Sequence, residues 1–104
     1  MPVTTIDSRQ VHVNDEGFLT DPAEWDEALG AALAGQIGID LGDEHWKAIR
    51  FLRQDFATHG ETPTLRRVTV AGGIPTKTLF QLFPRKPAKK MAYIAGLPKP
   101  HGCV

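Results

Sequence analysis

The thiol of Cys103 is the strongest nucleophile in this sequence of 104 residues. The thiolate form of cysteine is the reactive one, and an unperturbed cysteine has a pKa of about 8.5. Cys103 is also the only cysteine, so there is no Cys-x-x-Cys pair and an intramolecular dithiol–disulfide cycle is excluded. A lone thiol near the end of the chain could carry one sulfur atom into the pocket of another protein.

The segment that carries this thiol, LPKPHGCV, is predicted to be extended. Pro98 and Pro100 remove backbone donors and oppose a helix, and Gly96 and Gly102 are the predicted hinges. We therefore predict a mobile C-terminal arm over residues 96–104 that presents the thiol to another protein. The alternative is an incidental cysteine in a frayed terminus, because exposure alone does not make a thiol reactive.

Charge is segregated along the chain, although the formal net charge is zero. No acidic residue follows Glu61, whereas eight lysines and arginines do. This asymmetry favours an anionic partner, either an acidic protein surface or nucleic acid. The alternative is that the two halves of the chain pack together and neutralise each other. The predicted partner-docking residues are Arg85, Lys86, Lys89, Lys90 and Lys99.

Composition argues against several other classes of protein. Four scattered histidines and one cysteine do not form a zinc-ligand pattern, and Gly72-Gly73 lacks the flanking residues of a phosphate loop. Neither a metal nor an organic cofactor is therefore predicted. No secretory signal and no long apolar run is recognisable, so we expect a cytoplasmic protein without a membrane partner.

The pattern of apolar and turn-forming residues predicts a single domain over residues 1–104, in the α+β class. β-Branched residues in 3–6 and 11–13 indicate short strands, and residues 14–17 supply turn chemistry between the second strand and the apolar pair that follows. A small N-terminal hairpin or meander is the resulting prediction.

Helical segments follow, separated by proline and glycine. The first is predicted to start at Asp21-Pro22, with Asp21 as the N-cap, and to place Trp25, Leu29 and Leu33 on one apolar face. Trp25 and Trp46 are both predicted to pack in the core, because each fits the helical spacing of its apolar neighbours. The predicted segments are 21–37, 43–60, 63–70 (a helix or a strand), 75–83 and 87–95.

Several segments together resemble one family of proteins. The tail IAGLPKPHGCV follows PAKK and the LFP of residues 82–84. Upstream, EGFL, DPAEW and DEHWKAIRFLR occur in the expected order from residue 16 to residue 53. Over nearly the whole chain, this arrangement resembles the DsrC/TusE family of sulfur-transfer proteins.

The resemblance implies a fold and a role for the thiol. The implied fold is a small β-meander or hairpin packed on an array of four to five helices, with a flexible C-terminal arm. Cys103 would accept sulfane sulfur as a persulfide and relay it, as a sulfurtransferase or carrier within a pathway. Members of the DsrC branch have a second cysteine eleven positions earlier, where this sequence has Ala92. The chain therefore looks more like the single-cysteine TusE type.

The resemblance also implies partners. The donor would be similar to TusBCD or DsrEFH, and the acceptor would be either a thiouridylase that modifies tRNA or a protein similar to sulfite reductase. The segment 67–79 looks shorter than in typical members, and this region helps to form partner surfaces in the family. The choice between tRNA thiolation and dissimilatory sulfur metabolism therefore stays open.

A second interpretation assigns DNA binding to residues 62–86, within which residues 69–86, TVAGGIPTKTLFQLFPRK, resemble the helix-turn-helix end of TetR-type repressors. Thr76, Lys77 and Thr78 would then begin a recognition helix, with Gly73 near the turn. Phosphate contacts would come from basic side chains on either side, namely Arg66, Arg67, Arg85 and Lys86. No dimerisation domain follows this segment, and helix pairs of this kind are common in proteins that do not bind DNA.

Overall fold

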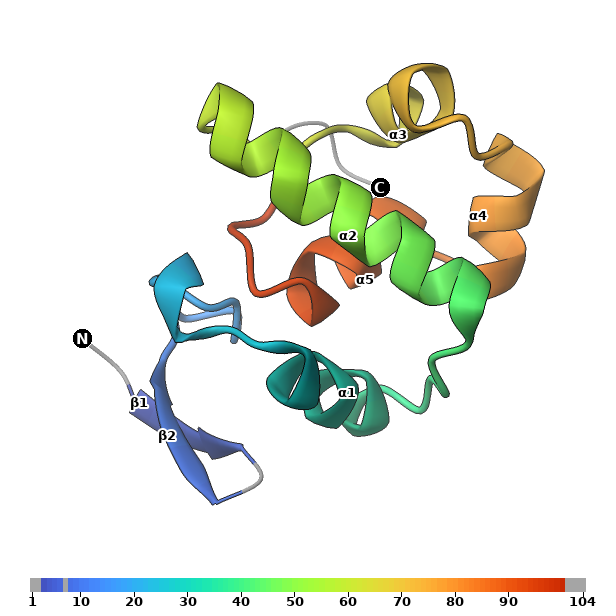
Figure 1. The fold of residues 1–104 in the computed structure, drawn as a ribbon. Coiled ribbons are helices and arrows are strands. Elements are labelled where there is room, and N and C mark those ends of the chain that lie inside the picture. The colour runs from blue at the N-terminus through green and yellow to red at the C-terminus, as the bar shows by residue number, and fades with distance from the viewer. Residues whose placement is uncertain (1–2, 7, 101–104) are drawn as a thin grey trace.

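The computed structural model describes residues 3–6 and 8–100, and Figure 1 shows its elements. Within these residues lie a two-stranded antiparallel sheet and five α-helices. Their bounds are β1 Val3–Ile6, β2 Arg9–His12, the 3-10 turn η1 Pro22–Glu24, α1 Glu27–Gln36, α2 Asp43–His59, α3 Leu65–Gly72, α4 Thr76–Leu82 and α5 Pro87–Ile94. The predicted α+β class, with an N-terminal hairpin and a helical array, is confirmed. The predicted site residues Gly102 and Cys103 lie outside the described residues.

The N-terminal hairpin follows its period-two pattern. Val11 and Val13 are buried while His12 between them is exposed, because successive side chains of a strand point to opposite faces. The turn predicted at residues 14–17 is present. The Asn14 side-chain oxygen accepts hydrogen bonds from the backbone N–H groups of Glu16 and Phe18, at 3.0 and 3.1 Å. The chain then returns, so that Leu19 forms a bridge with Val13.

The first predicted helix is wrong in its start and its continuity. Asp21 caps only the short turn η1, the backbone is extended at Trp25, and α1 begins at Glu27 with Asp26 as its N-cap. The physical reason is a contact with a residue that is distant in the sequence. The indole N–H of Trp25 donates to the backbone oxygen of Ile94 at 2.8 Å, and this bond is made from an extended residue outside the helix.

The other helices lie close to their predicted positions. Gly60 and Gly73 close α2 and α3 in the left-handed conformation, with φ of 74° and 71°. Segment 63–70 contributes a helix and no strand, and Thr64 caps it by accepting from the N–H of Arg67. α5 packs against α1, α2 and α4, so it is the central helix of the array (Figure 1).

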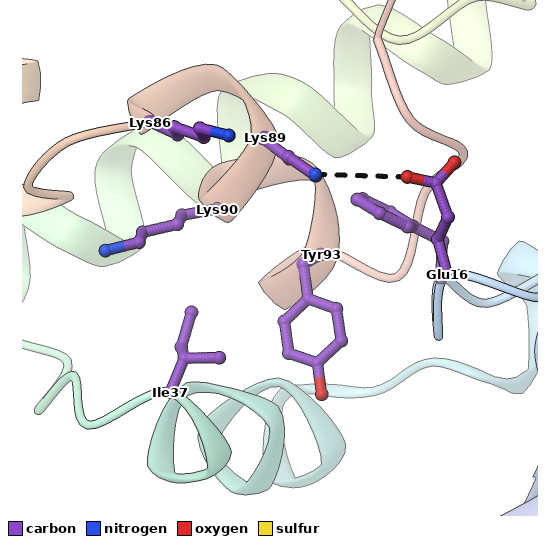
Figure 2. A pocket seen from close by; sticks show the side chains of 7 residues that line it. Glu16, Ile37, Lys86, Lys89, Lys90 and Tyr93 are labelled. Atoms are coloured by element: carbon purple, nitrogen blue, oxygen red, sulfur yellow. Dashed lines mark ion pairs between the residues drawn. The ribbon is translucent and has the colours of Figure 1, made fainter.

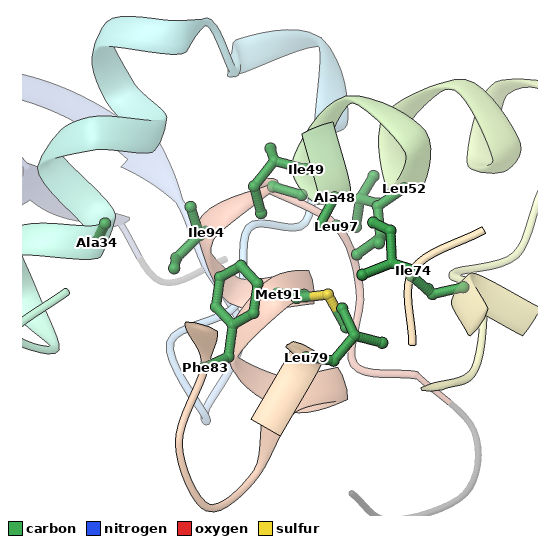
Figure 3. Close-up of a cluster of buried hydrophobic side chains, with 12 residues drawn as sticks. Ala34, Ala48, Ile49, Leu52, Ile74, Leu79, Phe83, Met91, Ile94 and Leu97 are labelled. Carbon is green, nitrogen blue, oxygen red and sulfur yellow. The ribbon is translucent and has the colours of Figure 1, made fainter. Parts of the chain in front are cut away.

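Two groups of buried apolar side chains hold the elements together. The larger one joins α2, α4 and α5, and Figure 3 shows Met91 of α5 among side chains from the surrounding helices. The smaller one joins the hairpin to α1 through residues such as Val11 and Leu33. Trp25 and Tyr93 pack against both groups, and they therefore connect the hairpin side of the molecule to the helical side.

Candidate functional site

The described part of the tail begins at a tightly packed joint where α5 ends. Arg53 of α2 donates to the backbone oxygens of Ala95, at 2.9 Å, and Pro22, at 3.0 Å. Its guanidinium lies 4.4 Å from the centre of the Trp25 ring, a cation–π distance. Burial lowers the pKa of Arg53 below its ordinary value, but a guanidinium stays protonated in proteins. Trp25 and Arg53 thus satisfy carbonyl groups that the end of a helix leaves without partners.

Gly96 sits inside this joint, which differs from the predicted hinge. It is buried, has φ of 69°, and its backbone N–H bonds the oxygen of Tyr93. A Cβ at this position would lie 2.5 Å from Cδ1 of Trp25, closer than such atoms can approach. Glycine is therefore required here by close packing and by a left-handed backbone. In the structure Gly96 fixes the direction in which the tail leaves α5.

Beyond Gly96, the described tail is held on two sides. Leu97 is buried, and the hydroxyl of Thr62 donates to the backbone oxygen of Pro98 at 2.7 Å. The ammonium of Lys99 bonds a carboxylate oxygen of Glu16, in the turn that follows the hairpin, at 3.2 Å. Residues 96–99 are therefore fixed to the body of the molecule by contacts from three separate segments.

A groove lies beside this anchored tail, between α5, the end of α1 and the turn at Glu16 (Figure 2). Its volume is about 380 Å³. Apolar surface comes from Phe18, Ile37 and Tyr93, and the Phe18 and Tyr93 rings meet edge to face at 6.0 Å between centres. Three lysines of the α5 region complete the lining, namely Lys86, Lys89 and Lys90.

The groove brings together most of the predicted docking residues. Lys89 lies 3.9 Å from the same Glu16 carboxylate oxygen that binds Lys99, so Glu16 connects the groove to the tail. Lys90 donates to the backbone oxygen of Pro84 at 2.6 Å, which holds its stem along the start of α5. Arg85 is exposed with φ of 78° and does not line the groove.

Folding alone does not favour this arrangement of lysines. Lys86, Lys89 and Lys90 all lie at the start of α5, where the helix dipole is positive, and no acidic residue occupies the first turn. Positive charge at this end of a helix costs stability, typically by about 0.3–1 kcal/mol for an exposed group at low ionic strength. Such a cluster is compensated when an anionic partner approaches it.

The prediction that the two halves neutralise each other is correct only in part. Glu16 pairs with Lys89 and Lys99, and Asp55 of α2 pairs with Arg67 of α3. Within the part of the chain that the structure describes, the remaining basic residues of this region have no carboxylate within ion-pair distance. These residues are Arg66, Lys77, Arg85, Lys86 and Lys90.

The ion pair of Asp55 and Arg67 joins α2 to α3. The Asp55 side chain is 6% exposed and accepts three hydrogen bonds from Arg67 at 2.9–3.1 Å. His59 lies 3.2 Å from the same carboxylate. The hydrogen bonds from Arg67 lower the pKa of Asp55 below its ordinary value of 3.8, and the positive charge of Arg67 adds to the effect.

The ion pair of Asp55 and Arg67 makes the free energy of unfolding depend on pH in the acid range. Because the folded-state pKa of Asp55 is the lower one, its stabilisation is fully present above the ordinary pKa and is lost as the pH falls through the folded pKa. We expect Asp55→Asn to lower the urea midpoint of unfolding near pH 7, and to differ less from the parent protein near pH 3. The exposed Asp40→Asn is the control. A deficit of Asp55→Asn that stays constant with pH would contradict this assignment.

The predicted helix-turn-helix is present as α3 and α4, with Gly73 in the turn. Its predicted phosphate contacts are not all available. Arg67 is bound to Asp55, and the hydroxyl of Thr76 pairs with that of Thr69 at 3.0 Å. Arg66 and Lys77 are exposed.

Other kinds of site find no support in the described residues. No helix among them is both long and apolar enough to cross a membrane. No cluster of three histidine, cysteine, aspartate or glutamate side chains there could hold a metal ion.

Fold and site together define a small α+β protein whose central last helix leads into an anchored tail beside a lysine-rimmed groove. The family model described as DsrC like protein matches residues 5–104, and the chain belongs to this DsrC-like family.

Individual relatives agree with this assignment. The sulfurtransferase TusE of Salmonella paratyphi A is 34% identical over 105 residues, which cover 94% of this chain and 96% of the relative. The solution structure of DsrC from Allochromatium vinosum has a TM-score of 0.85 and 36% identity, and covers 98% of this chain and 97% of that one. The structure of the oxidized gamma-subunit of the dissimilatory sulfite reductase (DsrC) from Archaeoglobus fulgidus has a TM-score of 0.78 and 38% identity. The match covers 99% of this chain and 100% of that one.

Sequence reasoning did not find the residues that anchor the tail and complete the groove. Arg53, Thr62 and Glu16 give no periodic signal, and their partners lie 42, 36 and 83 residues away. Arg53 and Glu16 do lie in segments that carry the family resemblance, which is the only trace of their roles in the sequence. In the sequence, Phe18 and Ile37 cannot be distinguished from ordinary core residues.

Proposed function

We propose that this protein is a sulfur carrier, which accepts sulfane sulfur as a persulfide on Cys103 and passes it to a partner protein. The observation that carries the proposal is the family match, which extends through the tail to residue 104 and includes the only thiol of the chain. The relatives named sulfurtransferase TusE support the same role.

The transfer step is an exchange between sulfur atoms. The thiolate of Cys103 attacks the outer sulfur of a donor persulfide, a new sulfur–sulfur bond forms, and the donor's own sulfur leaves as a thiolate. Nothing is oxidised or reduced overall, because one sulfur–sulfur bond replaces another. The reverse reaction with an acceptor thiol passes the sulfur on. Since Ala92 stands where a second cysteine would be, the proposed chemistry involves one thiol per chain.

The proposed partners are a sulfur donor and a sulfur acceptor. The TusE relatives favour a relay toward tRNA thiolation, with a donor of the TusBCD or DsrEFH type and a thiouridylase as acceptor. The Archaeoglobus fulgidus relative is described as a subunit of dissimilatory sulfite reductase, which supports an acceptor of that kind as the alternative. We propose Lys86, Lys89, Lys90 and Lys99 as docking residues, and a cytoplasmic location.

The direct test is intact-protein mass spectrometry after incubation with a polysulfide, or with a cysteine desulfurase and cysteine. We expect a gain of one sulfur mass that reductant removes. Trypsin should release the peptide 91–104, since the bond between Lys99 and Pro100 resists cleavage, and this peptide should carry the added sulfur. A protein that gains no sulfur from either donor is not a carrier.

Nucleic-acid binding through residues 62–86 stays a prediction. The consecutive helices α3 and α4 and the exposed Arg66 and Lys77 favour it, whereas the engagement of Arg67 by Asp55 reduces the phosphate contacts that it can make. Binding of a DNA duplex that weakens steeply with salt and persists in Cys103→Ser would support this second function.

A further inference from the structure

The lysine-rimmed groove combines two features that ordinary surface does not. Its apolar part is formed by Phe18, Ile37 and Tyr93, from three different segments. Lys86, Lys89 and Lys90 form the basic part of the lining, and Glu16 connects the groove to Lys99. Four lysines and one glutamate leave a formal net charge of +3 at this place among the described residues.

The chemistry of the lining selects the kind of occupant. An apolar centre surrounded by charged groups is the arrangement of a protein–protein contact, in which a hydrophobic side chain fills the centre and charges pair at the rim. A nucleic-acid duplex would bind the lysines through its phosphates, but its bases stay stacked on one another and would leave the apolar lining without a matching group. The volume of about 380 Å³ is enough for a large side chain and part of its backbone.

Two lysines at the groove already bind a carboxylate, that of Glu16. Its carboxylate lies 3.2 Å from Nζ of Lys99 and 3.9 Å from Nζ of Lys89, so this part of the rim already holds one carboxylate. Lys86 and Lys90 have no carboxylate partner among the described residues. The rim therefore has room for further carboxylates supplied from outside the chain.

We propose that the groove docks an acidic segment of a partner protein, in which a large hydrophobic side chain lies between aspartates or glutamates. The hydrophobic side chain packs against Ile37 and Tyr93, and the flanking carboxylates pair with Lys86 and Lys90. Because Glu16 also holds Lys99, the segment binds next to the anchored tail. The proposal rests on the carrier function, since a carrier must dock with its donor and its acceptor.

The test is a titration of the full-length, ¹⁵N-labelled protein with the acetylated and amidated peptide Asp-Glu-Phe-Glu-Asp, followed by NMR. We expect the largest amide shifts at Phe18, Ile37 and Tyr93. Replacing the acidic residues of the peptide by Asn and Gln, or its Phe by Gly, should weaken binding about tenfold each, a loss typical of a well-placed contact. Raising the salt from about 0.05 to 0.5 M should weaken it as well.

Matched variants show whether the groove itself binds. Lys86→Glu with Lys90→Glu should weaken peptide binding about tenfold or more, because attraction becomes repulsion. Lys47→Glu with Lys77→Glu reverses the same charge on exposed positions outside the groove lining, and should leave binding unchanged. Thermal unfolding of both variants confirms that they fold.

Three results would overturn the proposal. They are amide shifts centred on α3 and α4, equal losses in the two double variants, or shifts of the groove residues by a single-stranded oligonucleotide but not by the peptide. Polysulfide loading of the same wild-type preparation tests the carrier function separately. Loading without peptide binding overturns the groove proposal alone, and peptide binding without loading overturns the carrier function alone.

Discussion

Cys103→Ser is expected to reduce sulfur loading to background while leaving the fold unchanged. A serine hydroxyl is not ionised near neutral pH and does not form persulfides, and the chain contains no second thiol that could replace it. The measurement is transfer of ³⁵S from labelled cysteine by a cysteine desulfurase, followed on non-reducing gels. We expect no residual sulfur loading in Cys103→Ser, because no other side chain in this protein can form a persulfide.

Two comparisons make this result specific to the thiol. His101→Ala changes a close neighbour in the sequence but keeps the thiol, and we expect it to load sulfur. The unfolding temperature of Cys103→Ser should equal that of the parent protein. Label retained on the serine variant would mean that the sulfur is bound elsewhere, and the carrier assignment to Cys103 would then be wrong.

Gly96→Ala is expected to destabilise the protein by about 2–4 kcal/mol. A residue other than glycine held at positive φ costs about 1–3 kcal/mol. The new Cβ would also meet Cδ1 of Trp25 at 2.5 Å, which displaces the ring and weakens its hydrogen bond to Ile94, worth about 1 kcal/mol. A loss of this size lowers Tm by at least about 8 °C in a domain of this length. Circular dichroism melting measures it.

Gly60→Ala is the matched control for this prediction. Gly60 also has positive φ, 74°, but a Cβ there would meet nothing within 4 Å. We therefore expect Gly60→Ala to lose only the cost of the backbone conformation, about 1–3 kcal/mol as at Gly96. The difference between the two variants isolates the contact with Trp25. If both variants lost the same stability, the contact of the new Cβ with Trp25 would contribute nothing, and the prediction for Gly96 would be wrong.

The elements that were predicted well are those with local signals. Gly60 and Gly73 end their helices, and the alternation of Val11 and Val13 marks a strand. The first helix was misplaced because its apolar spacing includes Trp25. That residue leaves the helical conformation for a hydrogen bond to a backbone oxygen 69 positions later, and no local pattern contains this information.

The site was predicted in part, for a similar reason. Clustered lysines are visible in the sequence, so Lys86, Lys89 and Lys90 could be named as docking residues. The apolar part of the groove could not, because Phe18 and Ile37 come from segments that meet α5 only after folding. Gly96 was predicted as a hinge, and the structure places it in a closely packed joint with a left-handed backbone. A glycine required by close packing and a glycine that serves as a hinge look the same in a sequence.

The hydrogen bond from Thr62 to the backbone oxygen of Pro98 has a consequence for the distance over which sulfur can be delivered. Cys103 follows Pro98 by five residues, and a fully extended chain spans at most about 3.3–3.6 Å per residue. While this anchor holds, the Cα atom of Cys103 stays within about 18 Å of the Cα atom of Pro98. In the proposed relay, donor and acceptor would therefore have to bring their reactive sulfur inside one small sphere, where a tethered group reaches millimolar effective concentrations. A short tether of this kind favours a relay in which donor and acceptor bind in turn to the same face of the protein.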